Sequence, residues 1–399
     1  MAAFAERATL LRGGDLYTVS RGVLPDTDLL IEDGKIAAIG EDLEPPADAD
    51  VVDVRGKRVY PGLIAPFTTL GLIEIGAVRA TDDRDEVGEI TPEVSVHVAY
   101  APDSDLIPTV RSHGITTVQV VPTGSGIAGR SFLTHLTGWT KEDAGVVLDE
   151  GLIVTWPSLA IRTGWWIETE PEEQKKRIAE NRERIVTAFE GARAYHDARK
   201  AGVDVEYDPR WEAMRPVFDG ELPVYVRADD ERQIVEVVAF AERFDLEVVL
   251  VGGAEADRVV DLLAEHDVPV LLGSTTSLPT RQDDPYDSRF TLPAELERSG
   301  VRFALGHLTW GAWDVRNLPF QAGQAIAFGL DPERALRAIT LSTAEILGID
   351  GQQGSLDVGK DATLFVSAGD VLDVVGQHVE RMWIEGREIS LDDRHKRLY

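Results

Sequence analysis

Short apolar segments alternate with longer amphipathic segments through most of the chain. The apolar runs predict strands. They lie at residues 60–65, 115–121, 152–157, 222–227, 246–251, 268–273 and 301–306. Helical periodicity is clearest at 172–200, 230–244 and 256–266. This alternation predicts parallel strands joined by helices, as in an α/β barrel. Seven strands are one short of an eight-stranded barrel, and residues 131–138 are predicted to supply the eighth strand or an inserted hairpin.

The two ends of the chain have a different, β-rich pattern. Residues 1–58 read as short strands and turns, with a tight hairpin at "EDGK" (32–35). After a final helix predicted at 331–349, strands are predicted at 361–369 and 379–389. Neither end alone would make a stable sheet, so we expect them to pair into one small β-sandwich beside the barrel. The predicted organisation is therefore a sandwich made from 1–58 and 351–399, and a barrel over 59–350.

The amino-acid composition excludes several kinds of chemistry and bears on the cellular location of the protein. The chain has 399 residues and no cysteine, which excludes disulfides, thiolate metal sites and cysteine nucleophiles. The N-terminal residues lack the apolar run of a signal peptide, and no apolar stretch is long enough to span a membrane. A cytoplasmic location is the expectation.

The net charge of −30 bears on binding partners. A polyanion would repel nucleic acid and anionic membranes, so neither is expected as a partner. Scarce lysine beside this acidic excess fits either adaptation to high salt or a GC-rich genome with an acidic surface, and the two remain open. The expected partner is a small-molecule substrate, and a homo-oligomer is compatible with the sequence.

Several motifs resemble those of one protein family. They are "IEDGKIAAIG", "GKRVYPGLI", "GLDPERALRAITLSTAEILGI", "GSLDVGKDATLFV" and "WIEGREI". Together they resemble the amidohydrolase superfamily, in the branch near imidazolonepropionase. The resemblance implies a (β/α)8 TIM-type barrel with a composite β-sandwich, and hydrolysis of carbon–nitrogen bonds. Fold alone does not determine chemistry, which depends on the site.

The resemblance also implies metal ligands at strand ends, and this chain departs from them. The family has two histidines after the first barrel strand, a histidine after each of two later strands and an aspartate after the last. The corresponding residues here are Phe67, Thr69, Arg227, Gly252 and Leu308. The usual metal site is therefore predicted to be absent, and no cofactor is predicted. A metal held by other residues, for instance Glu74, Asp229 and His307, stays open.

Other residues near predicted strand ends are candidates for the chemistry. Glu74 and Arg79, in the long loop 71–93, could act as base and substrate clamp, or belong to a solvated acidic loop. Arg227 could bind a substrate carboxylate or phosphate, with Asp229 as a catalytic candidate beside it. Alternatively, Arg227 forms an internal salt bridge with Asp229 or Glu74.

The loop after the last predicted strand holds His307, together with Trp310 and Asp314 as candidates for substrate binding. His307 could be a general base near neutral pH, although a lone histidine is more often structural. Thr69 is a further candidate for substrate binding. A third segment, Gly124–Gly129, matches G-x-G-x-x-G, but the residues after it do not read as a helix, which argues against dinucleotide binding. Gly126 and Arg130 are instead candidates for an anion-binding loop, the alternative being a glycine-rich turn.

Two functions from different classes follow. One is an amidohydrolase-like enzyme that cleaves a carbon–nitrogen bond of a small polar or peptide-like substrate without the usual metal. The other is a catalytically silent barrel that binds a ligand or a partner protein. The second predicts a barrel mouth filled by Phe67, Arg227 and internal ion pairs.

Overall fold

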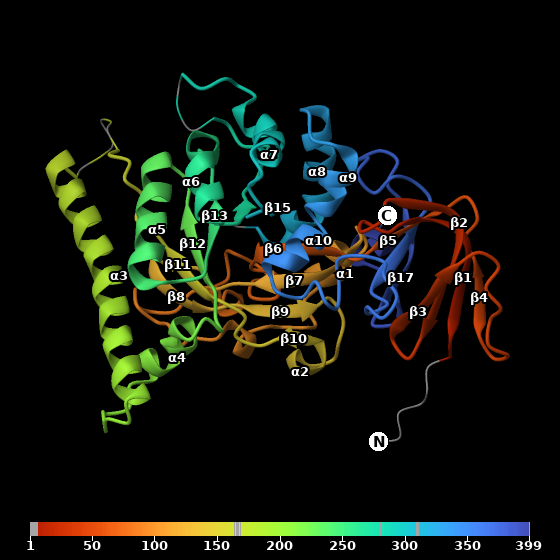
Figure 1. The fold of residues 1–399 in the computed structure, drawn as a ribbon, viewed down its shortest axis with the longest axis horizontal. Coiled ribbons are helices and arrows are strands. Elements are labelled where there is room, and N and C mark those ends of the chain that lie inside the picture. The colour runs from red at the N-terminus through yellow and green to blue at the C-terminus, as the bar shows by residue number, and fades with distance from the viewer. Residues whose placement is uncertain are drawn as a thin grey trace.

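A computed structural model describes residues 7–162, 164, 167, 169–279, 281, 283–308 and 311–398. The fold combines a barrel with a sheet built from both ends of the chain. Figure 1 shows the N-terminal strands, in red, beside the C-terminal strands, in blue, at one end of the molecule, and the long helix α3 at the other. No helix among the described residues is long and apolar enough to cross a membrane.

Eight strand positions surround the barrel, as predicted for a TIM-type fold. They are β6 (Leu63–Thr68), β7 (Ile115–Val120), β8 (Gly126–Arg130) with β9 (Phe132–His135), β11 (Leu152–Thr155), β12 (Val224–Ala228), β13 (Val248–Gly252), β14 (Val270–Leu272) and β15 (Phe303–Leu305). Each neighbouring pair from β11 to β15 is parallel, and so are β6 and β7. A short strand, β10 (Gly145–Val147), pairs with the outer edge of β9.

The eighth position is filled by a strand that runs in the opposite direction. β8 pairs antiparallel with β11 and β9 pairs antiparallel with β7, and only Ser131 separates the two. They form one strand, bent at Ser131, between β7 and β11. The strand predicted at 131–138 is present, but it begins five residues earlier and is reversed relative to the other barrel strands.

The seam between β15 and β6 is closed by a non-strand segment. The Leu305 N–H donates to the Ala338 carbonyl (2.9 Å), and the Ile64 N–H donates to the Ile339 carbonyl (3.0 Å). The prediction of one helix over 331–349 is wrong for this reason. The chain forms α9 (Pro332–Arg337) and α10 (Leu341–Ile346), because the carbonyls between them bond to the barrel rather than along a helix.

The other helices agree better with the predicted pattern. They are α1 (Leu106–Arg111), α2 (Lys141–Ala144), α3 (Pro171–Lys200), α4 (Pro209–Phe218), α5 (Glu231–Phe244), α6 (Val260–Glu265), α7 (Ser288–Arg298), α8 (Leu318–Ala327) and α11 (Arg394–Leu398). α5 begins with a capping box in which the Asp230 carboxylate accepts from the Gln233 N–H and the Gln233 side chain accepts from the Asp230 N–H. The segment predicted as a helix at 256–266 starts with a 3-10 turn (Ala256–Val259) before α6.

The two ends of the chain pair into one eight-stranded sheet, which confirms the expected composite domain. Its strands are β1 (Thr9–Tyr17), β2 (Val23–Glu32), β3 (Lys35–Gly40), β4 (Asp50–Asp53), β5 (Arg58–Pro61), β16 (Leu364–Ser367), β17 (Val379–Ile384) and β18 (Arg387–Ile389). β16 lies between β5 and β17 and joins the two halves. The predicted strand 379–389 is a hairpin, since Glu385 and Gly386 adopt positive φ and turn the chain.

Candidate functional site at the barrel mouth

The carboxyl ends of the parallel barrel strands define the mouth, where barrel enzymes place their reactive residues. Thr69 follows β6, Arg227 and Asp229 lie at the end of β12, and Thr275 follows β14. His307 and Leu308 follow β15. The mouth therefore brings to one end of the barrel several side chains that the sequence separates widely.

Apolar side chains occupy two of the family's metal-ligand positions. Phe67 and Leu308 pack against the hydrophobic cluster that fills the barrel interior. Both have positive φ, of 54° and 41°, which is uncommon for residues with bulky side chains. Carbon atoms offer no lone pairs, so the side chains at these positions do not fit a divalent ion.

Two further ligand positions do not supply a metal ligand either. Arg227, half-buried on β12, carries a permanent positive charge. Gly252 has no side chain, and a Cβ there would overlap the Asp229 carboxylate. In the part of the chain that the structure describes, no three His, Cys, Asp or Glu side chains are grouped so that they could hold a metal. Glu74, Asp229 and His307 are thus not brought together as alternative ligands.

His307 lies between two polar side chains from the segment that follows β15. The Gln321 Nε2 contacts His307 Nδ1, and Asp314 Oδ2 is 3.9 Å from His307 Nε2. Burial lowers the pKa of His307 below its ordinary value, and the nearby Asp314 charge opposes this shift. His307 is therefore predominantly neutral at neutral pH.

Two threonine hydroxyls at the mouth have no hydrogen-bond partner among the described residues. Thr69 and Thr275 are only 5% and 3% exposed, and the Oγ1 atom of each is unpartnered. A buried polar atom without a partner costs free energy. Such hydroxyls can be satisfied by a bound polar ligand, so they support a binding role for this end of the barrel.

Asp229 is partly buried at the end of β12, whereas the loop residues Glu74 and Arg79 lie in solvent. The Asp229 N–H donates to Gln233 Oε1 (3.1 Å). Burial lowers the pKa of Arg289, and the negative charge of Asp229 opposes that shift. Glu74 and Arg79 are exposed in the loop after β6. Arg79 is 3.8 Å from Asp85, a weak surface ion pair.

The structure separates the glycine-loop candidates from each other. Gly126 pairs with Thr155 at the mouth end of β11, whereas Arg130 pairs with Leu152 at the opposite end. Arg130 donates to the Asp149 carboxylate (2.6 Å) and to the Glu93 carbonyl (3.1 Å). The segment continues as strand β8, without the helix that a dinucleotide site requires. Trp310 lies outside the described residues.

Glu150 is a buried carboxylate in the barrel core that sequence reasoning missed. It accepts hydrogen bonds from the Tyr225 hydroxyl, from Gln119 Nε2 (2.6 Å) and from Ser131 Oγ (2.7 Å). Gln119 in turn accepts from the Phe67 N–H (3.0 Å), so the network extends to the end of β6. Burial raises the pKa of Glu150, although these three donors oppose the shift. In sequence, Glu150 follows an aspartate and precedes a glycine, which is typical of a solvated turn.

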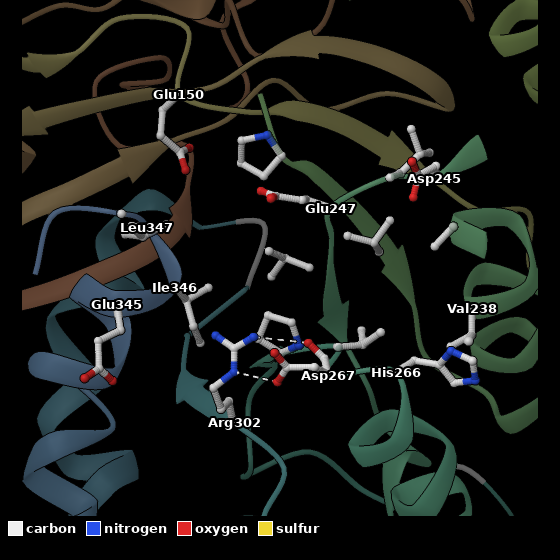
Figure 2. A pocket seen from close by; sticks show the side chains of 18 of the residues that line it. Glu150, Val238, Asp245, Glu247, His266, Asp267, Arg302, Glu345, Ile346 and Leu347 are labelled. Carbon is white, nitrogen blue, oxygen red and sulfur yellow. Dashed lines mark hydrogen bonds and ion pairs between the residues drawn. The ribbon is translucent and has the colours of Figure 1, made fainter. Parts of the chain in front are cut away.

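Glu150 also lines a pocket of about 710 Å³ at the other end of the barrel, where the parallel strands begin. Figure 2 shows this pocket, with the Glu150 side chain and the Arg302–Asp267 ion pair (3.0 Å). His266 is 3.4 Å from Glu242 at its edge. Barrel enzymes react at the opposite end, so we do not assign the reaction to this pocket despite its size.

The fold is a barrel next to a sheet that both ends of the chain form together. A solved amidohydrolase structure has the same overall fold. The amidohydrolase family model matches residues 231–388. An amidohydrolase structure from Thermotoga maritima MSB8 has a TM-score of 0.83 and 26% identity, covering 96% of this chain and 99% of that one. Over nearly its whole length the chain is similar to members of the amidohydrolase superfamily, which agrees with the resemblance seen in its motifs.

Two named relatives have similar or slightly lower sequence identity. The chain is 25% identical over 395 residues to imidazolonepropionase of Geobacillus kaustophilus (strain HTA426), covering 86% of this chain and 84% of that protein. It is 23% identical over 399 residues to amidohydrolase tasK of Hapsidospora irregularis, but spans only 39% of that protein.

Proposed function

We propose that the protein hydrolyses a carbon–nitrogen bond of a small polar substrate at the barrel mouth, without a divalent ion at the family's usual position. The observation that carries this proposal is the pair His307 and Asp314, two ionisable groups 3.9 Å apart in the segment that follows the last barrel strand. Similarity to the amidohydrolase superfamily suggests the class of reaction. The apolar residues Phe67 and Leu308 at ligand positions favour a route without the usual metal.

The spacing of the pair suits activation of water. The 3.9 Å between His307 Nε2 and Asp314 Oδ2 is too long for a direct hydrogen bond and leaves room for a reacting oxygen atom beside the pair. Proton removal by a positioned side chain contributes typically about 10²–10⁴ in rate. A bound metal would in addition lower the pKa of water to about 7. Without that effect, we expect a slow enzyme or one with an activated substrate.

Neighbouring groups could hold the substrate. The Thr69 and Thr275 hydroxyls would bond to its polar atoms, which would satisfy both buried oxygens. Arg227 would pair with a substrate carboxylate or phosphate. Asp229, on the same strand end, and Glu74, in the loop, remain candidate bases that variants can separate from Asp314.

A second candidate function is ligand or partner binding without turnover. It is favoured by the packing of Phe67 and Leu308 onto the barrel interior, which fills space that a reacting group could occupy. This function needs the mouth to bind but requires no proton transfer, so it predicts that Asp314→Asn leaves ligand affinity largely intact.

The test combines metal analysis with a hydrolysis screen. Protein purified without chelator, with and without added Zn²⁺ or Mn²⁺, is measured by elemental mass spectrometry. Chelated protein is then screened for amine release from N-acyl amino acids, cyclic amides and dipeptides. We expect hydrolysis without bound metal, lost about 10²–10⁴-fold in Asp314→Asn.

Matched controls give each result a meaning. Asp103→Asn changes an exposed aspartate that is not among the candidate site residues and should leave the rate unchanged. Asp229→Asn and Glu74→Gln test the other two candidate bases. Activity that requires about one metal per chain would contradict the metal-independent route, and substrate binding with no turnover in any preparation would favour the silent barrel.

A further inference from the structure

Gln321, on α8, contacts the histidine of the candidate site and was not among the site residues expected from the sequence. We propose that Gln321 is a positioning residue that holds His307 with its proton on Nε2, so that His307 donates a hydrogen bond to the substrate and Asp314 takes the proton from water. The roles given to His307 and Asp314 rest on the proposed function, whereas the position of the proton on His307 can be measured without any substrate.

The orientation of the Gln321 amide is set by the backbone. The side chain is only 2% exposed, and its Oε1 accepts from the Thr275 N–H (3.3 Å). The amide nitrogen therefore faces His307 Nδ1, and an amide NH2 group can only donate. A ring nitrogen that accepts a hydrogen bond carries no proton. A neutral imidazole with a bare Nδ1 must carry its proton on Nε2.

The other ring nitrogen, Nε2, lies on the side of Asp314. His307 Nε2 is 3.9 Å from Asp314 Oδ2, which is beyond direct hydrogen-bond distance. Asp314 is the charged group that acts on the pKa of His307, and burial keeps the ring predominantly neutral. A neutral imidazole with N–H at Nε2 is a donor for a developing oxyanion, and it is a poor base because its one lone pair is used by Gln321.

The reaction step then balances without an external acid. A water proton moves to Asp314 as the water oxygen bonds to the substrate carbonyl carbon, and the carbonyl electron pair moves to oxygen. The His307 Nε2–H stabilises that oxyanion without transferring its proton. When the carbonyl re-forms, the carbon–nitrogen bond breaks and protonated Asp314 returns the proton to the leaving nitrogen.

The proton position can be read from protein labelled with ¹⁵N in its histidines. Two-bond ¹H–¹⁵N correlation spectra distinguish the two neutral tautomers, and the His307→Asn variant assigns the signal. His113 is an internal reference of the opposite kind, because its Nδ1 lies 2.9 Å from the Thr109 carbonyl oxygen and must donate. We expect His307 protonated on Nε2. Protonation of wild-type His307 on Nδ1 would overturn the proposal.

Substitution of Gln321 gives a second readout. In Gln321→Glu the carboxylate accepts, so the proton should move to His307 Nδ1 and the donor at Nε2 should be lost. Amine release should then fall about 10²–10³-fold, as when an oxyanion donor is removed. Gln324→Leu, a turn along α8, is the matched control and should leave the His307 spectrum unchanged. An unmoved proton in Gln321→Glu would contradict the positioning role. The expected tautomers with no hydrolysis would contradict the proposed function but leave that role intact.

Discussion

The Glu150 network makes a specific prediction about stability and pH, tested by Glu150→Gln. This carboxylate is 7% exposed and accepts three hydrogen bonds from side chains of the barrel core. The glutamine is nearly isosteric and mimics the protonated acid. Its oxygen can accept from Gln119 and Ser131, and its NH2 group can donate to the Tyr225 hydroxyl, which can rotate to accept. The substitution thus removes a buried charge while keeping most of the hydrogen bonds.

The sign follows from the raised pKa of Glu150. A group whose pKa is higher in the folded than in the unfolded state stabilises the fold below its unfolded value, here 4.5, and loses that contribution as pH rises through its folded value. Relative to wild type, Glu150→Gln should therefore become progressively more stable as pH rises. The difference in free energy of unfolding can grow by at most about 1.4 kcal/mol per pH unit. The rearranged hydrogen bonds should cost about 1 kcal/mol at every pH.

Urea unfolding, followed by tryptophan fluorescence at several pH values from about 5.5 to 8.5, measures this difference. These pH values lie above the isoelectric point of about 4.6. They avoid the precipitation that is expected close to that point. Glu41→Gln, at an exposed position, is the control and should give a difference that does not change with pH. A Glu150→Gln difference that stays constant, or that turns against the variant as pH rises, would refute the reasoning.

Three further predictions concern local packing, helix capping and metal. Gly62→Ala places a Cβ on the buried Thr116 hydroxyl and should lower the free energy of unfolding by about 1–3 kcal/mol. Gly351→Ala, where a Cβ would meet nothing within 4 Å, should leave it unchanged. The midpoints of urea unfolding compare the two variants. Asp230→Ala removes the cap of α5 and should cost about 1 kcal/mol by the same assay, while Asp230→Asn should retain most of the stability. Chelator treatment should leave the melting temperature unchanged by calorimetry, and a clear drop would indicate a structural metal.

Much of the fold could be predicted because parallel barrel strands are buried on both faces. Such strands appear as short continuous apolar runs, and β7, β12 and β13 lie where those runs are. The hairpin at residues 32–35 was predictable from its Asp33-Gly34 pair, and both residues have the positive φ that this turn requires.

The differences arise where tertiary hydrogen bonds override the local pattern. Residues 331–349 have a helical sequence, but Ala338 and Ile339 use their carbonyls to close the barrel, which divides the helix. The reversal of β8 and β9 depends on pairing with β7 and β11, and no local signal gives strand direction.

The candidate site was predictable in position but not in arrangement. Strand ends pointed to His307, Arg227 and Thr69, since parallel strands bring their carboxyl ends together. Gln321, in contrast, reaches His307 from a helix whose orientation no sequence pattern specifies. Glu150 looks like a solvated acid because the direction of one side chain at a strand start depends on the packing around it.

The placement of β16 between β5 and β17 has a consequence for biosynthesis. Roughly 300 residues separate β5 from β16 along the chain. At about 5–20 residues per second, the N-terminal strands would wait roughly 15–60 s on the ribosome before their partner is made. During that interval one side of β5 has unpaired backbone groups, the kind of edge that pairs with other chains. Nascent-chain chaperones would therefore have their main task at the N-terminal strands, well before the barrel mouth exists.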